Sequence, residues 1–209
     1  KQTVETLIKC IVIASGNDAS VAMAEHIAGS EGEFVRRMNE RAAGLGMENT
    51  HFEDCCGLTE SDNHYTSAYD VALMSRELVT RYPKILEYSS VWMDTITHHT
   101  AKGDSEFGLT NTNKLVKNYE GATGLKTGST SIALYNLSAS ATRDNLSLIA
   151  VIMKAPTTKI RFAEAEKLLD YGFSNFQYSK FSNENDILKS ISVQKGVKDS
   201  IDLAYETSV

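Results

Sequence analysis

The first part of the chain carries three successive segments with helical hydrophobic periodicity. Residues 4–12 place apolar side chains at every third or fourth position, which predicts an amphipathic helix. A second helix is expected from about residue 18 to Gly29, a typical C-terminal stop. Ser30 and Glu33 have the spacing of a capping box and predict a third helix. We expect these helices to form one helical lobe.

A loop and a further helix separate this lobe from a region of β character. Residues 49–66 show no periodicity and are rich in turn-forming residues. Ser67 begins an amphipathic segment that should end before Pro83. The residues then become β-branched and aromatic, and residues 91–97 predict a strand.

The following region has the pattern of an antiparallel sheet closed by a helix. Residues 135–142 alternate apolar and small polar side chains, and residues 146–153 are almost continuously apolar. The short connection between them predicts a hairpin. Residues 162–171 have the spacing of a closing helix. Helices followed by strands and a last helix predict an α+β fold, with an antiparallel sheet backed by helices.

The pattern changes again at about residue 174. After a polar stretch, residues 187–193 and 201–204 form short strand-like pieces that cannot bury a core by themselves. We therefore expect an α+β domain over residues 1–173. Residues 174–209 are expected to be the beginning of a second, β-rich domain.

Composition and charge narrow the class of protein. The 209 residues are 42% hydrophobic, enough to bury a sizeable core. A net charge of −6 argues against a dedicated nucleic-acid binder, which usually has a basic surplus. No apolar run approaches the about 18 residues that a membrane span needs. The cysteines match neither a disulfide framework nor, with nearby histidines, a standard zinc pattern, so no metal site is expected: Cys10, Cys55 and Cys56.

Two short segments are candidates for chemistry. Residues 15–17, Ser-Gly-Asn, set a hydroxyl and a carboxamide two residues apart at a break between helices. Residues 126–128, Lys-Thr-Gly, lie in a glycine-flanked strand that a ligand or another backbone can approach closely. Taken singly, each segment is as typical of a turn or strand end as of a functional site.

The order and spacing of the two segments point further. A Ser-x-Asn element after a buried helix, a Lys-Thr-Gly strand about 110 residues later, a hairpin and a closing helix together resemble the penicillin-binding protein and serine β-lactamase superfamily. Residues 15–20, 123–130 and 135–141 are similar to one branch, the low-molecular-weight D-alanyl-D-alanine carboxypeptidases of bacterial cell walls. The resemblance covers residues 1 to about 173 and implies a β-lactamase/transpeptidase-like fold that lacks its N-terminal part here.

The resemblance implies a serine-type carboxypeptidase that removes the last residue from peptidoglycan stem peptides ending in D-Ala-D-Ala. In this family a serine attacks the penultimate carbonyl, D-alanine leaves, and water hydrolyses the acyl-enzyme. β-Lactam antibiotics such as penicillins would be ligands of the same site. No cofactor and no nucleic-acid partner is implied. The expected location is the outer face of the bacterial cytoplasmic membrane, with membrane contact only through a C-terminal anchor outside this chain.

The resemblance also implies roles for individual residues. Ser15 would pass a proton toward the departing amine, and Asn17 would hold the substrate amide with its carboxamide. Lys126 would fix Ser15 and keep the site electropositive. Thr127 would bond the terminal carboxylate, and the strand beyond Gly128 would pair with the peptide backbone.

Two further residues are expected at the site by the same resemblance. The backbone N–H of Ser129 would contribute to an oxyanion hole. The family pattern, followed without gaps through the hairpin, places a carboxylate-binding residue at Arg161. The alternative is a surface arginine, but the value of a bidentate clamp favours the site. Leu134 stands where the family is expected to have glycine, which predicts a differently shaped hairpin.

One motif of the family is missing. Its Ser-x-x-Lys, which carries the nucleophile and its general base, does not precede Ser15. Residues 192–195 have this pattern but follow Lys-Thr-Gly, so we interpret them as a chance occurrence. We expect an internal part of a working carboxypeptidase that is inactive by itself. The alternatives are a non-catalytic relative that binds stem peptides, and a serine β-lactamase.

Overall fold

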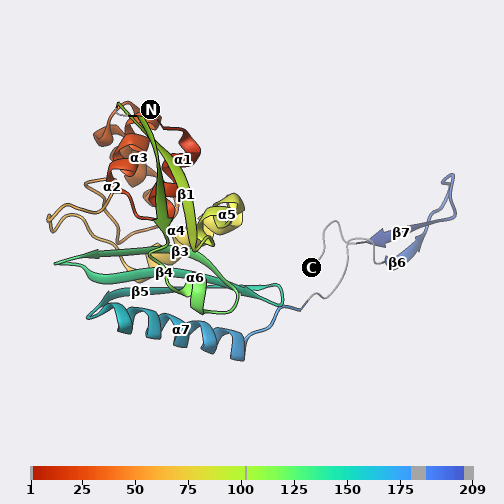
Figure 1. Cartoon of the computed structure of the whole chain (residues 1–209). Helices are drawn as coiled ribbons and strands as arrows, with labels where there is room; N and C mark the ends of the chain where they lie inside the picture. The colour runs from red at the N-terminus through yellow and green to blue at the C-terminus, as the bar shows by residue number, and fades with distance from the viewer. Residues whose placement is uncertain (1, 102, 180–186, 205–209) are drawn as a thin grey trace. The chain divides into compact units, whose positions relative to one another are not determined.

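The computed structural model describes residues 2–101, 103–179 and 187–204. The chain divides into two compact units between Asn175 and Phe176 (Figure 1). The helices of the first unit are α1 (Val4–Val12), α2 (Asn17–Ala28), α3 (Glu31–Gly44), α4 (Ala68–Arg81), η1 (Pro83–Ile85), α5 (Leu86–Ser89), α6 (Leu115–Asn118) and α7 (Thr158–Asn175). Its strands are β1 (Met93–Thr100), β2 (Gly103–Thr110), β3 (Ala122–Thr130), β4 (Leu134–Arg143) and β5 (Leu146–Ala155). The second unit contains β6 (Ile187–Ser192) and β7 (Ser200–Ala204).

The helices of the N-terminal lobe begin and end at local signals. The Thr3 hydroxyl accepts a hydrogen bond from the backbone N–H of Thr6 at 3.1 Å and caps α1. The Ser30 hydroxyl accepts from the N–H of Glu33 at 3.2 Å, as its capping-box spacing predicts. Gly29 ends α2 with a φ of 83°, the left-handed conformation that glycine adopts readily.

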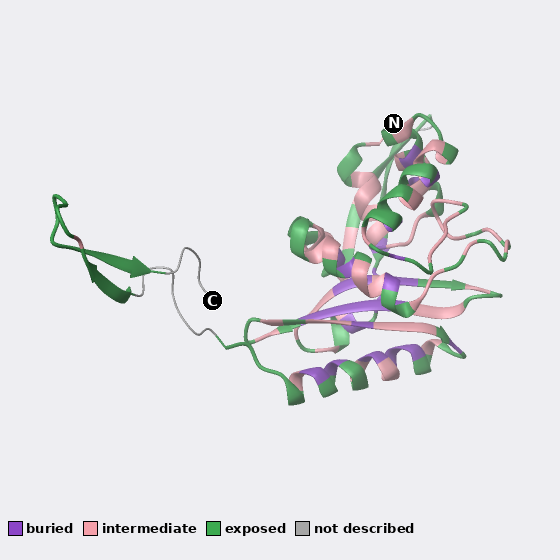
Figure 2. Cartoon of the chain, turned by 180° about the vertical axis from the view of Figure 1, so that it is seen from behind, coloured by how far each residue is buried: buried purple, intermediate pink, exposed green. Residues whose placement is uncertain are grey.

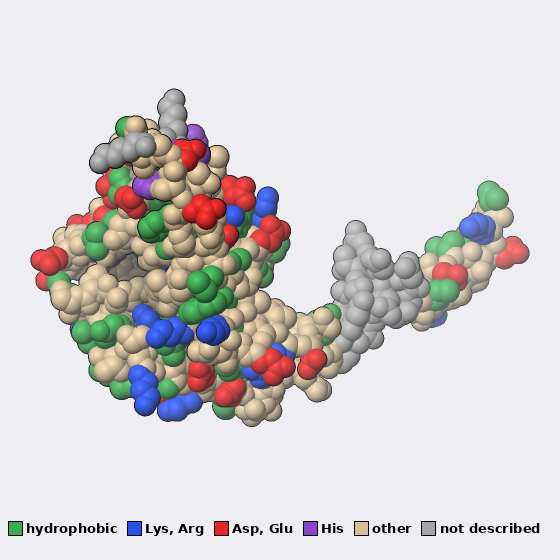
Figure 3. All heavy atoms as spheres, viewed as in Figure 1, with side chains coloured by type: hydrophobic (Ala, Val, Ile, Leu, Met, Phe, Trp, Pro, Cys, Tyr) green, Lys and Arg blue, Asp and Glu red, His purple; other side chains and the backbone are tan. Residues whose placement is uncertain are grey.

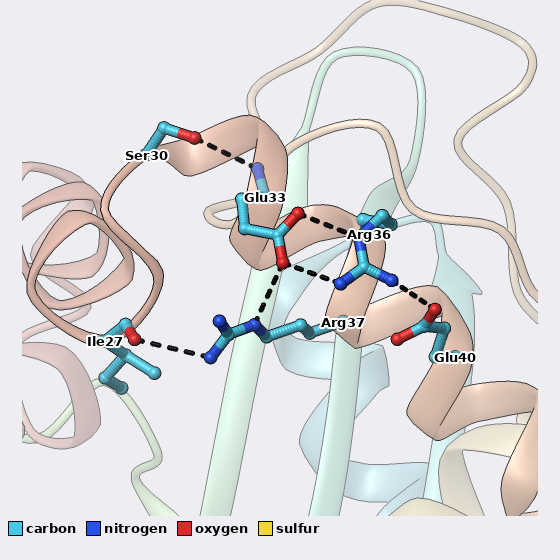
Figure 4. Close-up of polar contacts among 6 residues, drawn as sticks. All are labelled: Ile27, Ser30, Glu33, Arg36, Arg37 and Glu40. Atoms are coloured by element: carbon cyan, nitrogen blue, oxygen red, sulfur yellow. Dashed lines mark hydrogen bonds and ion pairs between the residues drawn. The ribbon is translucent and has the colours of Figure 1, made fainter.

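Charged side chains connect α2 and α3 (Figure 4). The Glu33 carboxylate accepts hydrogen bonds from Arg36 Nη2 at 2.6 Å and from Arg37 Nε at 3.2 Å. Arg37 Nη1 also reaches the backbone carbonyl of Ile27 in α2 at 3.4 Å, and Arg36 pairs with Glu40. The two guanidinium groups lower the pKa of Glu33 to about 2. Because the network lies at the surface, it contributes little to the stability of the fold.

The strands β1 and β2 form a separate antiparallel pair beside the helical lobe (Figure 1). Residues 103–106 are glycine or polar and lack the pattern of a strand, and they become part of β2 because pairing with β1 satisfies their backbone groups. Lys9 of α1 binds Asp94 of β1 with a nitrogen–oxygen distance of 3.0 Å. This ion pair attaches the hairpin to the lobe.

The central sheet has the order β3-β4-β5, with all strands antiparallel. Figure 2 shows α7 lying along one side of the sheet, with buried residues on the strands and on the helix. The core between them consists of Leu115, Leu137, Ala139, Ala141, Ala150, Phe162, Ala165 and Leu169. On the other side, the Ser138 hydroxyl of β4 meets the Ser75 hydroxyl of α4 at 2.7 Å. The predicted hairpin and the sheet backed by helices are both confirmed.

The second unit exposes apolar side chains on its described strands. Figure 3 shows green side chains on its surface, and the residues with 41–63% exposure are Ile187, Leu188, Ile191, Ile201 and Leu203. A two-stranded sheet of this size is at best marginally stable alone. Among the described residues, no helix combines the length and the apolar character needed to cross a bilayer.

Gly121, at the entrance to β3, provides a test of how tightly the sheet is packed. Its φ is 78°, and an added Cβ would lie 2.4 Å from the carbonyl oxygen of Thr142. Gly46 has a similar φ of 75°, but a Cβ there would meet nothing within 4 Å. We predict that Gly46→Ala lowers the free energy of unfolding by about 1–2 kcal/mol, which is the cost of placing a residue with a Cβ in the left-handed conformation. Gly121→Ala should lower it by a further ~1–3 kcal/mol, the usual cost of overpacking.

Urea unfolding of the two variants measures this difference. The two glycines have nearly the same φ. The larger loss of unfolding free energy expected for Gly121→Ala therefore measures the contact of the added Cβ with Thr142. Equal losses for Gly46→Ala and Gly121→Ala would show that the strand entrance relaxes freely.

Candidate active site

The two candidate segments meet between the helical lobe and the central sheet. Lys126 Nζ donates a hydrogen bond to Ser15 Oγ at 2.7 Å, although the two residues are 111 positions apart. The same nitrogen donates to the carbonyl oxygen of Thr127 at 2.7 Å. The structure therefore places a lysine ammonium group directly on a serine hydroxyl.

Ser15 lies in a tight connection between α1 and α2. Its φ is 61°, a left-handed conformation that is uncommon for residues other than glycine. The N–H of Gly16 bonds back to the carbonyl of Cys10 at 2.9 Å, and Ile13 is fully buried. Strained backbone of this kind is often found at functional sites, because the surrounding packing has to maintain it. Here the packing fixes the position of a single hydroxyl.

Lys126 is directed toward the helical lobe by the register of the sheet. It lies opposite Ser138 of β4, and directly opposed residues in an antiparallel pair point to the same face. Ser138 contacts Ser75 of α4, so Lys126 lies on the face of the sheet that α4 contacts, opposite α7. The neighbours of Lys126 in β3, Leu125 and Thr127, are buried.

The site is electropositive because two cations lie near each other in a half-buried place. Burial, together with the charge of Arg161, lowers the pKa of Lys126 to about 8. Burial also lowers the pKa of Arg161 itself. Within the described part of the chain, no carboxylate lies within 4.0 Å of either cationic group. Such a pair favours the approach of an anion.

Arg161 is a buried residue of the first turns of α7 and not a surface arginine. Its Nη1 donates to the carbonyl of Asn136 at 3.2 Å, and its guanidinium carbon lies 5.7 Å from the centre of the Tyr135 ring. The Nε–H is buried without a hydrogen-bond acceptor among the described residues. A guanidinium has five N–H donors, so this one retains donors that a carboxylate could accept from.

Three other expected residues are close to this contact in sequence. Asn17 is the exposed first residue of α2, two positions after Ser15, and its side chain makes no hydrogen bond to another described residue. Gly128 and Ser129 are exposed at the end of β3, an edge strand of the described sheet. The structure thus places Ser15 and Lys126 in contact, with the other three nearby in sequence and without a direct bond to them.

One neighbour of the site was not predicted from the sequence. Thr127 Oγ1 donates a hydrogen bond to Thr112 Oγ1 at 2.7 Å. Thr112 lies in the connection from β2 to α6 and has no motif around it beyond its two asparagine neighbours. Both neighbours, Asn111 and Asn113, are buried in the loop, which the sequence alone does not indicate.

Leu134 begins β4 in a conformation typical of glycine. Its φ is 53°, and it pairs with Thr130 across the hairpin that follows Ser129. A left-handed leucine costs about 1–2 kcal/mol relative to a right-handed one. The hairpin therefore has a glycine-type backbone at this position in spite of the side chain.

The arrangement has groups that can hold an anion and move a proton. Lys126 supplies a charge that titrates near neutral pH, and Ser15 supplies a hydroxyl already bonded to it. In the described ranges, no group of three or more His, Cys, Asp or Glu side chains could hold a metal ion. The three cysteines are free thiols.

The electrostatic coupling of Arg161 to Lys126 predicts a measurable shift. Arg161→Gln removes one of the two causes that lower the pKa of Lys126, so we expect this pKa to rise from about 8 toward its ordinary value. The rise should be partial, because burial is the larger cause. Titration of the Lys126 side chain by NMR measures it.

Arg143→Gln is the matched control for this titration. Arg143 is also held against aromatic rings, 4.6 Å from Tyr119 and 4.5 Å from Phe173, but it does not contribute to the pKa of Lys126. An unchanged Lys126 pKa in Arg161→Gln, or an equal shift in Arg143→Gln, would contradict the coupling.

Comparison with known proteins identifies relatives of the chain. Residues 1–157 match the peptidase family S11, described as D-alanyl-D-alanine carboxypeptidase. The chain is 45% identical over 203 residues to the D-alanyl-D-alanine carboxypeptidase DacF of Bacillus subtilis, covering 97% of this chain and 51% of the relative. It is 37% identical over 202 residues to DacA of Haemophilus influenzae, covering 96% and 49%. The chain thus spans about half the length of these curated relatives.

Solved structures confirm the predicted α+β, transpeptidase-like architecture. Penicillin-binding protein 5 of Haemophilus influenzae superimposes with a TM-score of 0.78 at 35% identity, covering 99% of this chain and 58% of that one. Penicillin-binding protein D2 of Listeria monocytogenes, in its ampicillin-bound form, superimposes with a TM-score of 0.71 at 32% identity, covering 82% and 68%. By sequence match and by fold, the chain belongs to the D-alanyl-D-alanine carboxypeptidase family.

Proposed function

We propose that this chain supplies the substrate-binding and proton-transfer part of a serine-type D-Ala-D-Ala carboxypeptidase that acts on peptidoglycan stem peptides. The observation that carries the proposal is the contact of Lys126 Nζ with Ser15 Oγ at 2.7 Å. It joins a Ser-x-Asn turn to a Lys-Thr-Gly strand in one half-buried, electropositive place. Since peptidoglycan lies outside the cytoplasmic membrane, we place the protein at the outer face of that membrane.

The C-terminal carboxylate of the stem peptide would bind near Thr127. The Thr127 hydroxyl is one donor, and the charges of Lys126 and Arg161 provide the attraction. Gly128 and Ser129 continue the exposed end of β3, where an extended peptide could add as a further strand. Asn17 would hold the peptide amide from the opposite side, with a donor and an acceptor on one side chain.

The proton step would use the Ser15–Lys126 pair. When the C–N bond to the terminal D-alanine breaks, the departing nitrogen needs a proton. Ser15 can donate its hydroxyl proton to that nitrogen and recover one from Lys126, which already donates to its oxygen. A lysine with a pKa of about 8 can hold or release a proton near neutral pH, whereas an ordinary lysine rarely releases one.

The acylating serine is a separate requirement. We propose that it comes from a Ser-x-x-Lys segment outside these residues, and that residues 174–209 begin a second domain of the same protein. β-Lactams would acylate the same serine, because they present a strained amide and a carboxylate to this site. The ampicillin-bound Listeria relative supports binding of this class of compound.

The chain alone should therefore bind substrate without cleaving it. We predict no release of D-alanine when the purified 209-residue chain is incubated with a diacetyl-L-Lys-D-Ala-D-Ala peptide. Free D-alanine is measured with a D-amino-acid oxidase assay, and a solution without protein sets the background. Release above that background would show that the chain already contains its nucleophile.

Binding of the same peptide should depend on the charge of Lys126. Because burial lowers its pKa to about 8, Lys126 is mostly charged at pH 7 and mostly neutral at pH 9. We expect the dissociation constant to rise through this range, by about tenfold, the value of one charge-assisted hydrogen bond. Lys126→Met should show the weaker affinity at every pH. Titration calorimetry at several pH values measures the profile.

Lys117→Met is the control for the loss of one positive charge. Lys117 lies over the Trp92 ring at 5.4 Å, in α6, and takes no part in the proposed site. Its variant should retain both the affinity and the pH dependence. If the unaltered chain binds the peptide equally at pH 7 and pH 9, Lys126 does not hold the substrate.

A further inference from the structure

We propose that Thr112 is a positioning residue of this site, which orients the Thr127 hydroxyl toward the terminal carboxylate of the substrate. The inference rests on the proposed function, because it assumes that Thr127 bonds that carboxylate. Thr112 itself would not touch the reacting atoms. It would act through the hydrogen bond that it shares with Thr127.

Thr112 is bonded to both halves of the site. Its hydroxyl oxygen accepts the hydrogen bond from Thr127 at 2.7 Å, next to Lys126. Its backbone N–H donates to the carbonyl of Ile13 at 3.1 Å, two positions before Ser15. A displacement of Thr112 would therefore change the position of the Thr127 hydroxyl and of the serine turn together.

The backbone on either side of Thr112 is held by buried amides. Asn111 Nδ2 donates to the carbonyl of Val91 at 2.8 Å, and Asn111 Oδ1 accepts from the N–H of Asn113 at 2.9 Å. Asn113 Oδ1 in turn accepts from the N–H of Leu115 at 3.2 Å. Both asparagines are at most 3% exposed. This support fixes the Thr112 hydroxyl where Thr127 needs it, as functional residues generally require.

The hydroxyls of Thr112 and Thr127 can exchange the roles of hydrogen-bond donor and acceptor when a ligand binds. In the structure Thr127 donates to Thr112, so the proton of Thr127 is engaged. A bound carboxylate would draw that proton to itself, and Thr112 would then donate its own proton to Thr127. A hydroxyl can do both, since it has one donor and two lone pairs. Two hydroxyls in series also strengthen the bond to the anion, because each hydrogen bond polarises the next.

A purely structural role for Thr112 makes a different prediction. If its hydroxyl only held the loop in place, its loss would weaken binding of any peptide that fits the site. If it orients Thr127, the loss should fall on peptides with a free carboxylate. The useful quantity is therefore the preference for a peptide ending in D-Ala-D-Ala over the same peptide with a C-terminal amide.

The experiment compares this preference in the full chain and three variants by titration calorimetry. Thr112→Val removes the hydroxyl at nearly constant volume and should reduce the carboxylate preference about three- to tenfold, the range for one supporting hydrogen bond. Thr112→Ser keeps a hydroxyl and should retain the preference. Thr142→Val is the matched control, because it also breaks a hydroxyl–hydroxyl bond, of 2.8 Å to Ser147, at the other end of β4.

The outcomes distinguish a positioning role of Thr112 from a purely structural one. An undiminished preference in Thr112→Val, or an equal loss for both peptides, overturns the role of Thr112 and leaves the proposed function standing. No preference in the unaltered chain overturns the proposed function and this inference with it. Thermal unfolding checks each variant, and Thr112→Ala gives the same comparison should Thr112→Val not fold.

Discussion

The ammonium group of Lys126 is held between the sheet and the helical lobe by a hydroxyl and a carbonyl, without a carboxylate within ion-pair distance in the described residues. Removing a charge from water without an opposite charge is costly, so the charged form is disfavoured and the pKa falls to about 8. The cost is bearable because Ser15 and Thr127 satisfy the donors. A carboxylate partner from the protein would remove this cost, and in the proposed function it would also occupy the place meant for the substrate carboxylate.

The fold supplies the rigidity that such an arrangement needs. β4 is covered on one side by α7 and contacted on the other by α4, so β3 pairs with a strand that has little freedom to move. The register with β4 then decides which face of the sheet Lys126 occupies, since a shift by one residue would reverse it. On the other side, the buried Ile13 and the left-handed Ser15 hold the hydroxyl against the ammonium group. The 2.7 Å hydrogen bond between Lys126 and Ser15 therefore depends on both the sheet and the turn after α1.

The sequence predicts features that depend on neighbouring residues better than features that depend on contacts between residues far apart in the chain. The capping box of Ser30 and the stop at Gly29 depend on neighbouring residues, and both were predictable. β2 depends on its pairing with β1, and α5 and α6 are single turns fixed by tertiary packing, so the local pattern did not indicate them. The Ser15–Lys126 contact joins residues 111 positions apart, and the motifs suggested it only through the family resemblance. Thr112 belongs to no motif, and its role depends entirely on where the loop lies.

The separation of binding from chemistry follows from these same contacts. In the proposed function, the groups that would recognise the carboxylate and those that would move the proton share Lys126, and their mutual hydrogen bonds form without the acylating serine. A substrate can thus be oriented by preformed hydrogen bonds before any covalent bond forms, which is the condition under which binding energy is best used in catalysis. In the proposed site the hydroxyl of Thr127 would meet the anion, and the structure shows that this hydroxyl is bonded to Thr112. Discrimination of a free carboxylate from an amide would then depend on a side chain that does not touch the bond that breaks.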